Sequence, residues 1–321
     1  MQMQVHTPDV SVVLAVYNGM PYIIQAVESI LGQTWDDLEL VLVNDASTDD
    51  TLARLHYIHD PRLRVIDLPE NVGQTAALNV GLRAAQGQFI ARQDADDISK
   101  PGRLAAQRAF LTAHPDYLLV GTAADLIDDK GRITGLVEHP TDDDGMRAAF
   151  AEGDNTMFHG SVMFRRAVLN QVGYYREGFR TSQDFDYWLR IAEQGKIGNI
   201  ASPPLYQYRL HAGQMTFTSY LRMKTEWQSI LKLAAIRADD PSSDDSAAYD
   251  DAIRELDEQF ADFTPSRAEK RRAMAELWRA KGVAYKNAGQ VFPMAYSLLR
   301  AFLWEPANPD FWRGVRNQWP R

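Results

Sequence analysis

The chain has 321 residues, enough for one large α/β domain with an appendage or for two modest domains. Its apolar share of 45% and charged share of 24% are typical of soluble globular proteins and exclude disordered and fibrous classes. A formal net charge of −9 argues against nucleic acid as a partner and favours small or neutral ligands. Because cysteine is absent, disulfides, thiolate metal sites and a cysteine nucleophile are excluded.

The N-terminal segment Met1–Asp9 is short and polar, without the basic stretch and apolar run of a signal peptide. No apolar run in the chain is long enough to span a bilayer. Together with the missing cysteines, these features favour a cytoplasmic location.

The first third alternates strand and helix patterns. Val10–Val16 and Leu38–Asn44 are β-branched apolar runs that predict strands, and the amphipathic stretch Tyr22–Leu31 between them predicts a helix. The pattern then repeats with a helix after Asp45, a strand at Leu63–Leu68, a helix at Gly73–Ala85 and a strand at Gln88–Gln93. Alternation of this kind predicts a mostly parallel, doubly wound α/β sheet with flanking helices.

The regularity weakens after Tyr117, which predicts a mixed second half of the same domain. Strand-like pieces occur at Leu118–Gly121, Ile133–Val137 and Ser161–Phe164, and a helix is expected at Phe185–Gln194. Beyond Tyr220 the spacing is helical as far as Trp319, with a polar break at Asp239–Ser246. We therefore expect one α/β domain at residues 1–217 and a C-terminal helical region at 218–321.

Polar segments follow each of the first four apolar runs. They are Tyr17-Asn18-Gly19, Asp45-Ala46-Ser47-Thr48-Asp49, Asn71-Val72-Gly73 and Asp94-Ala95-Asp96-Asp97. In open α/β sheets ligands bind beyond the carboxyl ends of the strands, so these segments are expected to meet at one binding edge.

The acidic turn at residues 94–97 is the strongest local signal. Carboxylates two residues apart at a strand end can face one cation, and hard oxygen ligands suit Mg²⁺ or Mn²⁺ carrying a diphosphate. The alternative is a solvated acidic turn that caps the helix beginning near Pro101, and for an isolated Asp-x-Asp this alternative would be preferred.

The surrounding motifs reverse that preference. Ser11–Asn18, Val41–Asp49, Asn71–Gly73 and Ala91–Asp97 occur in the order found in family 2 glycosyltransferases of the GT-A fold, which the chain resembles from about Val10 to about Thr216. The resemblance implies a nucleotide half at about residues 1–116 and an acceptor half at about 117–217. It also implies a divalent cation, Mn²⁺ or Mg²⁺, and a donor that is a UDP- or dTDP-sugar.

The resemblance assigns roles to individual residues. Ala15, Tyr17 and Asp45 would hold the nucleobase and ribose, Asn71 to Gly73 would shape the same pocket with Arg92 or Gln93 close by, Asp94 and the adjoining Ala95 would contact ribose or diphosphate, and Asp96 would bind the metal. The alternative for Asp45 is an N-cap of the following helix, a role open to Ser47 as well.

The segment Thr181–Arg190 resembles the family's Glu-Asp motif at the start of a helix. Its Asp corresponds to Asp184, which we expect to be the base that takes the acceptor's hydroxyl proton. Gln183 stands where Glu is usual, so one negative charge near the base is missing. For Asp186 the structural alternative, an acid in the first turn favoured by the helix dipole, is preferred.

Two further polar sets resemble family positions. His159-Gly160-Ser161 is the first, and the second is Tyr208-Arg209-Leu210-His211, where Arg209 would neutralise phosphate oxygens and His211 would be a third metal ligand. A structural salt bridge for Arg209 and a merely hydrogen-bonded His211 are equally acceptable alternatives. Tyr187 and Trp188 could stack against a sugar at the bottom of the acceptor site. Because they lie at helical spacing, burial in the core is the preferred interpretation.

The tail interleaves aromatic and basic residues, and a second basic run precedes it. Phe302, Trp304, Phe311, Trp312 and Trp319 alternate with Arg300, Arg313, Arg316 and Arg321. This pattern fits peripheral contact with an anionic membrane at its inner face, where a lipid-linked saccharide acceptor would lie. Packing of the helices on the catalytic domain is the preferred alternative, and the run Arg267, Lys270, Arg271 and Arg272 is most simply a solvated face.

The leading hypothesis is an inverting, metal-dependent glycosyltransferase of surface polysaccharide or glycoconjugate synthesis. A non-catalytic nucleotide-sugar-binding partner protein is the second hypothesis, because Gln183 replaces the usual Glu. A nucleotidyltransferase ranks last, since residues 17–21 contain no Lys or Arg to hold a triphosphate. Donor sugar and acceptor are not encoded in any pattern that we recognise.

Overall fold

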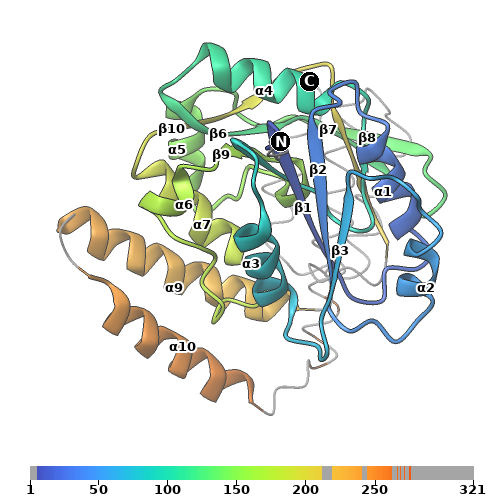
Figure 1. The fold of residues 1–321 in the computed structure, drawn as a ribbon. Helices are drawn as coiled ribbons and strands as arrows, with labels where there is room; N and C mark the ends of the chain where they lie inside the picture. The colour runs from blue at the N-terminus through green and yellow to red at the C-terminus, as the bar shows by residue number, and fades with distance from the viewer. Residues whose placement is uncertain are drawn as a thin grey trace, which may run out of the picture. The chain divides into compact units, whose positions relative to one another are not determined.

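The computed structural model describes residues 6–211, 219–240 and 244–261, together with positions 266, 268, 271 and 275. In chain order the described elements are β1 (Val10–Val16), α1 (Ile23–Leu31), β2 (Leu38–Asn44), α2 (Thr51–Leu55), β3 (Leu63–Asp67), α3 (Gln74–Ala84), β4 (Phe89–Arg92), β5 (Ile98–Ser99), α4 (Arg103–Ala113), β6 (Tyr117–Thr122), β7 (Ala124–Ile127), β8 (Ile133–Val137), α5 (Asp143–Ala151), the 3₁₀ turn η1 (His159–Ser161), β9 (Met163–Arg165), α6 (Val168–Gln171), α7 (Gln183–Ala192), β10 (Lys196–Ile200), β11 (Tyr206–Arg209), α9 (Tyr220–Asp239) and α10 (Ser246–Phe260) (Figure 1).

The chain divides into two compact units. The first comprises residues 1–124 and 138–208, and the second comprises residues 125–137 and 209–321. The sequence predicts two continuous domains with one boundary, at residue 217. In the structure the segment 125–137, which carries most of β7 and all of β8, groups with the C-terminal residues.

The first unit is built on a seven-stranded sheet with the order β10-β6-β9-β4-β1-β2-β3. β1 pairs in parallel with β2 and β4, β2 with β3, and β10 with β6, whereas β9 is antiparallel to both β4 and β6. The predicted mostly parallel α/β sheet is therefore confirmed. Because β9 runs against its neighbours, it begins at the edge of the sheet where β4 ends.

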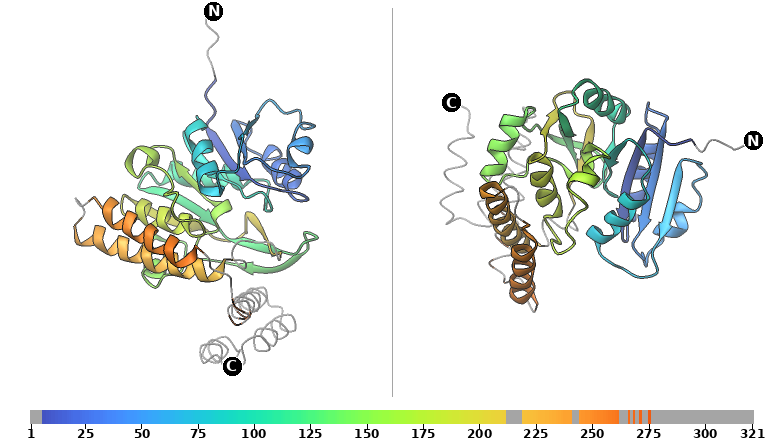
Figure 2. Two further views of the ribbon diagram at one scale, coloured as in Figure 1. Left: turned by 90° about the horizontal axis from the view of Figure 1, so that it is seen from below. Right: turned by 60° about the vertical axis from the view of Figure 1, so that its left-hand side comes forward.

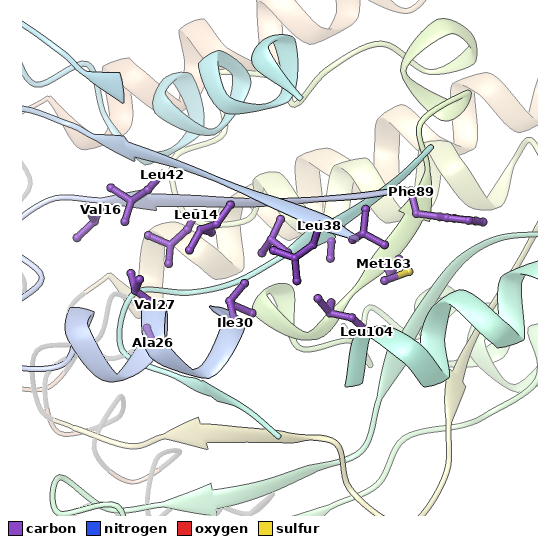
Figure 3. Packing of buried hydrophobic residues seen from close by; sticks show 14 of the residues in the cluster. Leu14, Val16, Ala26, Val27, Ile30, Leu38, Leu42, Phe89, Leu104 and Met163 are labelled. Atoms are coloured by element: carbon purple, nitrogen blue, oxygen red, sulfur yellow. The ribbon is translucent and has the colours of Figure 1, made fainter. Parts of the chain in front are cut away.

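The two faces of β1 are covered by different helices. Leu14 and Val16 on one face belong to a buried cluster with Val27 and Ile30 of α1 (Figure 3). Val13 on the opposite face lies against Gly81 of α3. Successive side chains of a strand point to opposite faces, so an uninterrupted apolar run is the pattern expected of a strand covered on both sides.

The predicted elements of the first unit are confirmed with small shifts at their ends. The helix expected at Phe185–Gln194 begins two residues earlier, at Gln183, and the strand expected at Ser161–Phe164 is Met163–Arg165. Residues 159–161 form the 3₁₀ turn η1 instead, and this turn enters β9 at the edge described above. A short pairing of β5 with β11, in which Ser99 lies opposite Tyr206, completes the first unit.

The second unit contains the neighbouring strands β7 and β8 and the helices α9 and α10. The two helices lie side by side (Figure 2) and are joined by ion pairs from Arg222 to Asp257 at 3.3 Å and from Arg237 to Asp245 at 2.6 Å. The predicted polar break between them is confirmed. No helix among the described residues is long and apolar enough to cross a bilayer. The aromatic and basic tail residues from 300 onward lie outside the described residues.

We predict that Gly81→Ala destabilises the protein, although alanine is the better helix former. A Cβ atom at Gly81 would lie 2.6 Å from Cγ1 of Val13, a fully buried β-branched side chain. Overpacking of this kind costs about 1–3 kcal/mol, more than the roughly 1 kcal/mol that alanine gains over glycine in a helix. Denaturant unfolding of the variant measures the difference. Ala84→Gly in the same helix is the control and should cost no more than about 1 kcal/mol; a gain in stability for Gly81→Ala would contradict the packing described.

Candidate active site

The loops after β1 and β2 are interlocked by hydrogen bonds. The side-chain oxygen of Asn18 accepts from the backbone N–H of Thr48 at 2.8 Å, and the N–H of Asn18 donates to Ser47 Oγ at 2.9 Å. Both loops use left-handed backbone, with φ of 53° at Asn18 and 54° at Ala46. That conformation costs an alanine about 1–2 kcal/mol, which the interlocking bonds offset. Tyr17, beside this junction, is 51% exposed.

Asp45 holds the third loop. One carboxylate oxygen accepts from the N–H of Val72 at 2.7 Å and the other from the N–H of Gly73 at 3.0 Å, while Asn71 donates from Nδ2 to the Asp45 carbonyl at 3.1 Å. The N-cap alternative for Asp45 is therefore wrong, because its carboxylate serves a different helix entrance. Helix α2 begins after Asp50, and no side chain caps it. Ser47 likewise bonds to Asn18 and caps nothing.

Arg92 is a buried cation at the end of β4. It is 1% exposed, and its guanidinium donates to the Val13 carbonyl at 2.6 Å, to Asp94 Oδ1 at 2.9 Å and to His159 Nε2 at 3.3 Å. One side chain thus joins β1, the acidic turn and the turn η1. A buried charge is stable only when paired and hydrogen-bonded, and Asp94 supplies the pairing charge.

The acidic turn is braced from inside by Gln93. Its fully buried side chain donates to the carbonyls of Asp94 and Asp97, both at 3.0 Å, and accepts from Ser99 Oγ at 2.6 Å. These bonds fix the backbone of residues 94–97. Ala95 is partly buried and packs against the main core. The turn is therefore rigid on its inner side, while Asp94 and Asp96 keep partial exposure.

The pKa of the Asp94 carboxyl is set by several opposing influences. Burial raises the pKa of Asp94, and the neighbouring charge of Asp96 raises that pKa further, although Arg92 and the N–H of Gly160 act in the opposite direction. Two carboxylates that repel each other at the end of a strand form a site where a cation would be favourable.

Gly160 is in close contact with the acidic turn. A Cβ atom at this position would lie 2.0 Å from Tyr206 Oη and 2.7 Å from Asp94 Oδ2. Only glycine leaves room for both neighbours. Strand β9 begins just after this glycine, so the antiparallel strand delivers η1 to Asp94.

Helix α4 holds the turn η1, a feature that the motifs do not reveal. Arg103 donates from one nitrogen to the carbonyls of Arg92 at 2.9 Å and Gly160 at 2.8 Å. One turn later Gln107 donates to the carbonyls of Val120 and Ser161 at 2.9 and 2.8 Å. Both side chains are fully buried. A polar pair at i and i+4 on the buried face of a helix is the signal that could have identified them.

His159 is neutral within this network. Burial, together with the charge of Arg92, lowers its pKa well below the usual range. Its Nε2 lies 3.1 Å from Tyr175 Oη, and its ring packs against Trp188. Tyr187 and Trp188 are fully buried, so the preferred core interpretation of these two aromatics is confirmed.

Asp184 lies in the first turn of α7 and has a perturbed pKa. Its Oδ1 accepts from the N–H of Phe185 at 2.8 Å and its Oδ2 from Nδ2 of Asn155 at 2.9 Å. Burial raises the pKa of Asp184 to about 6, and the charge of Asp94 contributes to the rise while the Asn155 bond lowers it. Asn155 was not identified from the sequence. The acidic turn is linked to α7 through Arg92, which bonds to Asp94 and to His159, and through the His159 ring, which packs against Trp188.

The neighbours of Asp184 on α7 are buried. Asp186 is fully buried and accepts from Arg190 Nε at 2.9 Å, which agrees with its structural interpretation. Gln183 is 4% exposed, and its Oε1 has no hydrogen-bond partner among the described residues. The amide avoids placing a second carboxylate charge in this low-dielectric pocket beside the base.

The chemistry of the acidic turn fits a divalent cation. Within residues 6–211, 219–240 and 244–261, no group of three or more acidic or histidine side chains is placed to hold a metal. Asp94 and Asp96 offer a pair of hard oxygen ligands instead. Mg²⁺ is usually held in this way, by one or two carboxylates together with substrate phosphates.

Arg209 and His211 belong to the second unit. Arg209 is 1% exposed, and it donates to the carbonyls of Asp128 and Asp129 in the turn between β7 and β8, at 3.1 and 3.5 Å. It therefore supports that turn. His211 is partly exposed. Their roles toward phosphate and metal stay predictions.

Comparison with known proteins agrees with this geometry. The model of glycosyl transferase family 2 matches residues 11–173, about half of the chain. The chain belongs to glycosyl transferase family 2. EpsE of Bacillus subtilis (strain 168), named as a glycosyltransferase, is 37% identical over 63% of this chain and 73% of its own length. The O-antigen biosynthesis glycosyltransferase WbnJ of Escherichia coli is 31% identical over 63% and 80%.

Solved structures confirm the GT-A fold of this family 2 glycosyltransferase. S. aureus TarS 1–349 in complex with UDP-GlcNAc is similar with a TM-score of 0.59 at 18% identity, covering 92% of this chain and 91% of TarS 1–349. The mannosyltransferase PcManGT from Pyrobaculum calidifontis, in complex with GDP-Man and Mn²⁺, reaches 0.56 at 21% identity, covering 98% and 85%. Family membership also rejects the nucleotidyltransferase alternative.

We predict that Asn155→Ala raises the pKa of Asp184 above about 6, because the bond from Nδ2 stabilises the ionised carboxylate. NMR titration of ¹³C-labelled aspartate carboxyls measures the change, and Asp184→Asn assigns the signal by removing it. Asp144→Asn, an exposed site on α5, is the control and should leave the titration unchanged. An unchanged or lower Asp184 pKa in Asn155→Ala would contradict the contact.

Proposed function

We propose that this enzyme transfers a sugar from a UDP- or dTDP-sugar to an acceptor hydroxyl in one displacement, with inversion at the anomeric carbon. The observation that supports this proposal is that Arg92 bonds to both Asp94 and His159, and the His159 ring packs against Trp188 of α7, the helix that carries Asp184. An acidic strand end and a carboxylate of raised pKa are the two kinds of group that the reaction needs.

The nucleotide would bind at the interlocked loops. Tyr17 is exposed beside the junction of Asn18 and Ser47, where its ring can stack on a nucleobase. Asp45 and the residues Asn71 to Gly73 would shape the ribose pocket, because Asp45 already fixes that loop through its carboxylate. The neighbouring structures hold UDP-GlcNAc and GDP-Man, so nucleoside diphosphate sugars are the donor class with a precedent on this fold.

Asp94 and Asp96 would hold the divalent cation, as the acidic pair fits one and one neighbour of this fold binds Mn²⁺. When bound, such a cation stabilises the negative charge on the departing diphosphate. Arg92 fixes the orientation of Asp94. Arg103 of α4 donates to the Gly160 carbonyl and so holds the turn η1 next to Asp94.

Asp184 would act as the base. Its carboxylate takes the proton from the acceptor O–H as that oxygen bonds to the anomeric carbon and the bond from this carbon to the diphosphate oxygen breaks. A pKa of about 6 leaves the carboxylate ionised at neutral pH yet more basic than an ordinary aspartate. Attack from the face opposite the leaving group inverts the configuration.

The acceptor would be a saccharide or a lipid-linked saccharide. WbnJ is named for O-antigen biosynthesis, which supports a role for this chain in polysaccharide assembly at the cell surface. Contact of the C-terminal region with the inner face of the membrane, where such acceptors lie, stays a prediction for residues outside those described.

We predict that Asp96→Asn removes the effect of metal on donor binding. UDP should raise the melting temperature of the unaltered enzyme more with Mn²⁺ than without it, because ligands of the native state stabilise it by mass action. Asp96→Asn should keep its own melting temperature but lose that increment in a thermal-shift assay. Asp36→Asn removes the same charge at a side chain that is 92% exposed and should retain the increment. A full increment in Asp96→Asn would refute the assignment.

We predict that Asp184→Asn lowers kcat by about 10²–10⁴-fold while the donor Kd changes little, because only the base is removed.

In the unaltered enzyme, kcat/KM should rise with pH through a single ionisation near 6, since the base acts only when deprotonated. Asn155→Ala should move this acidic limb to higher pH. Equal turnover of Asp184→Asn and the unaltered enzyme across an acceptor panel would exclude Asp184. Donor binding without transfer or hydrolysis in the unaltered protein would instead favour a binding-only role.

A further inference from the structure

A groove lies in the first unit, away from the acidic turn. It has a volume of about 870 Å³ and includes Asp9, which precedes β1, Gln88, which precedes β4, and Arg165, which ends the antiparallel β9. These positions mark the sheet edge opposite to the one that carries the acidic turn. With seven residues in β1 and about 3.3 Å per residue, the two edges are roughly 20 Å apart.

The groove carries an excess of positive charge in an acidic protein. Its lining includes Arg83, Arg108, Arg165 and Arg166 against Asp9 and Asp37. Both aspartates are already paired: Asp9 accepts from Arg108 Nε at 2.6 Å, and Asp37 lies 2.7 Å from His6 Nε2. Each acidic side chain of the groove thus already has a hydrogen-bond partner.

Two of the four arginines are committed to the fold. Arg108 is the partner of Asp9, and its guanidinium also lies 4.5 Å from the centre of the Trp35 ring. Arg165 donates to the carbonyls of Leu111 and His114 at the end of α4. Neither needs a ligand to satisfy it.

Arg83 and Arg166 are the two arginines of the groove that do not support the fold in this way. Both are exposed, and no acidic side chain among the described residues lies within ion-pair distance of either. Arg83 is held in place, because its guanidinium lies 4.9 Å over the Tyr174 ring. Arg83 and Arg166 line the same groove, and like charges repel each other, so an anion bound between them would be favourable.

We propose that this groove binds a phosphoryl group that carries two negative charges. Guanidinium groups match phosphate oxygens in a bidentate geometry, and two of them balance a dianion. Gln86, Gln88 and Asn170 line the same groove, and a side-chain amide can donate to the remaining oxygens. The volume suits a small phosphorylated molecule or the headgroup of a phospholipid.

The site is independent of the donor pocket. None of its residues belongs to the loops after β1, β2 or β4, and no divalent cation is required to balance its charge. Binding at the groove can therefore be measured in the presence of EDTA, where metal-dependent binding at Asp94 and Asp96 is suppressed.

The test compares binding of inorganic pyrophosphate to three forms of the full chain by isothermal titration calorimetry in EDTA at low salt. The double variant Arg83→Gln/Arg166→Gln should bind at least about tenfold more weakly than the unaltered protein. The control Arg54→Gln/Arg64→Gln removes the same charge from two exposed sites outside the groove and should bind normally. Equal affinity in all three forms, or no binding by the unaltered protein, would overturn the proposal.

A second arm distinguishes the sources of the phosphoryl group. Vesicles of phosphatidylcholine with and without phosphatidic acid are sedimented with the unaltered protein and with Arg83→Gln/Arg166→Gln. Extra sedimentation that depends on phosphatidic acid and is lost in the variant identifies a lipid headgroup. Pyrophosphate binding that is lost in the variant, with no difference on vesicles, identifies a free phosphorylated molecule. Sugar transfer should be retained in both double variants, because neither alters the catalytic edge.

Discussion

The contact between the Arg92 guanidinium and Asp94 is the interaction on which the candidate active site depends. A carboxylate stabilises a buried arginine by pairing its charge, and for Arg92 that carboxylate belongs to the acidic turn itself. The same guanidinium holds the Val13 carbonyl of the neighbouring strand and the ring of His159. The orientation of Asp94 is therefore fixed by the sheet and does not rely on a flexible loop.

The sheet geometry explains why residues distant in sequence meet at this contact. The parallel strands β1, β2 and β4 end at one edge, and β9, which is antiparallel to β4 and β6, begins there. Gly160 reaches Asp94 by that route, and Arg103 and Gln107 secure it from α4. A fully parallel sheet would have placed the start of β9 at the opposite edge, far from the acidic turn.

Much of this could be predicted from the sequence. The apolar runs predicted the parallel strands, because a strand covered on both faces needs apolar residues at every position, and the motifs after them predicted the acidic edge. The i, i+4 spacing could have marked Arg103 and Gln107 as buried polar residues, but the partners of these two side chains and of Asn155 could not be predicted. Each depends on a carbonyl or carboxylate that comes from a distant segment, so no local spacing encodes it. The capping alternative for Asp45 fails for the same reason, since the backbone N–H groups that donate to its carboxylate lie 27 and 28 residues later.

The interlocking of the loops after β1 and β2 has a consequence for recognition. Asn18 donates to Ser47 and accepts from Thr48 across the junction, and Asp45 secures the third loop. The walls of the proposed nucleobase pocket are thereby ordered before any donor arrives. Little conformational entropy is then lost from these loops on association, so contacts made there contribute to affinity nearly in full. Selectivity between bases would accordingly arise from the shape of a preformed recess.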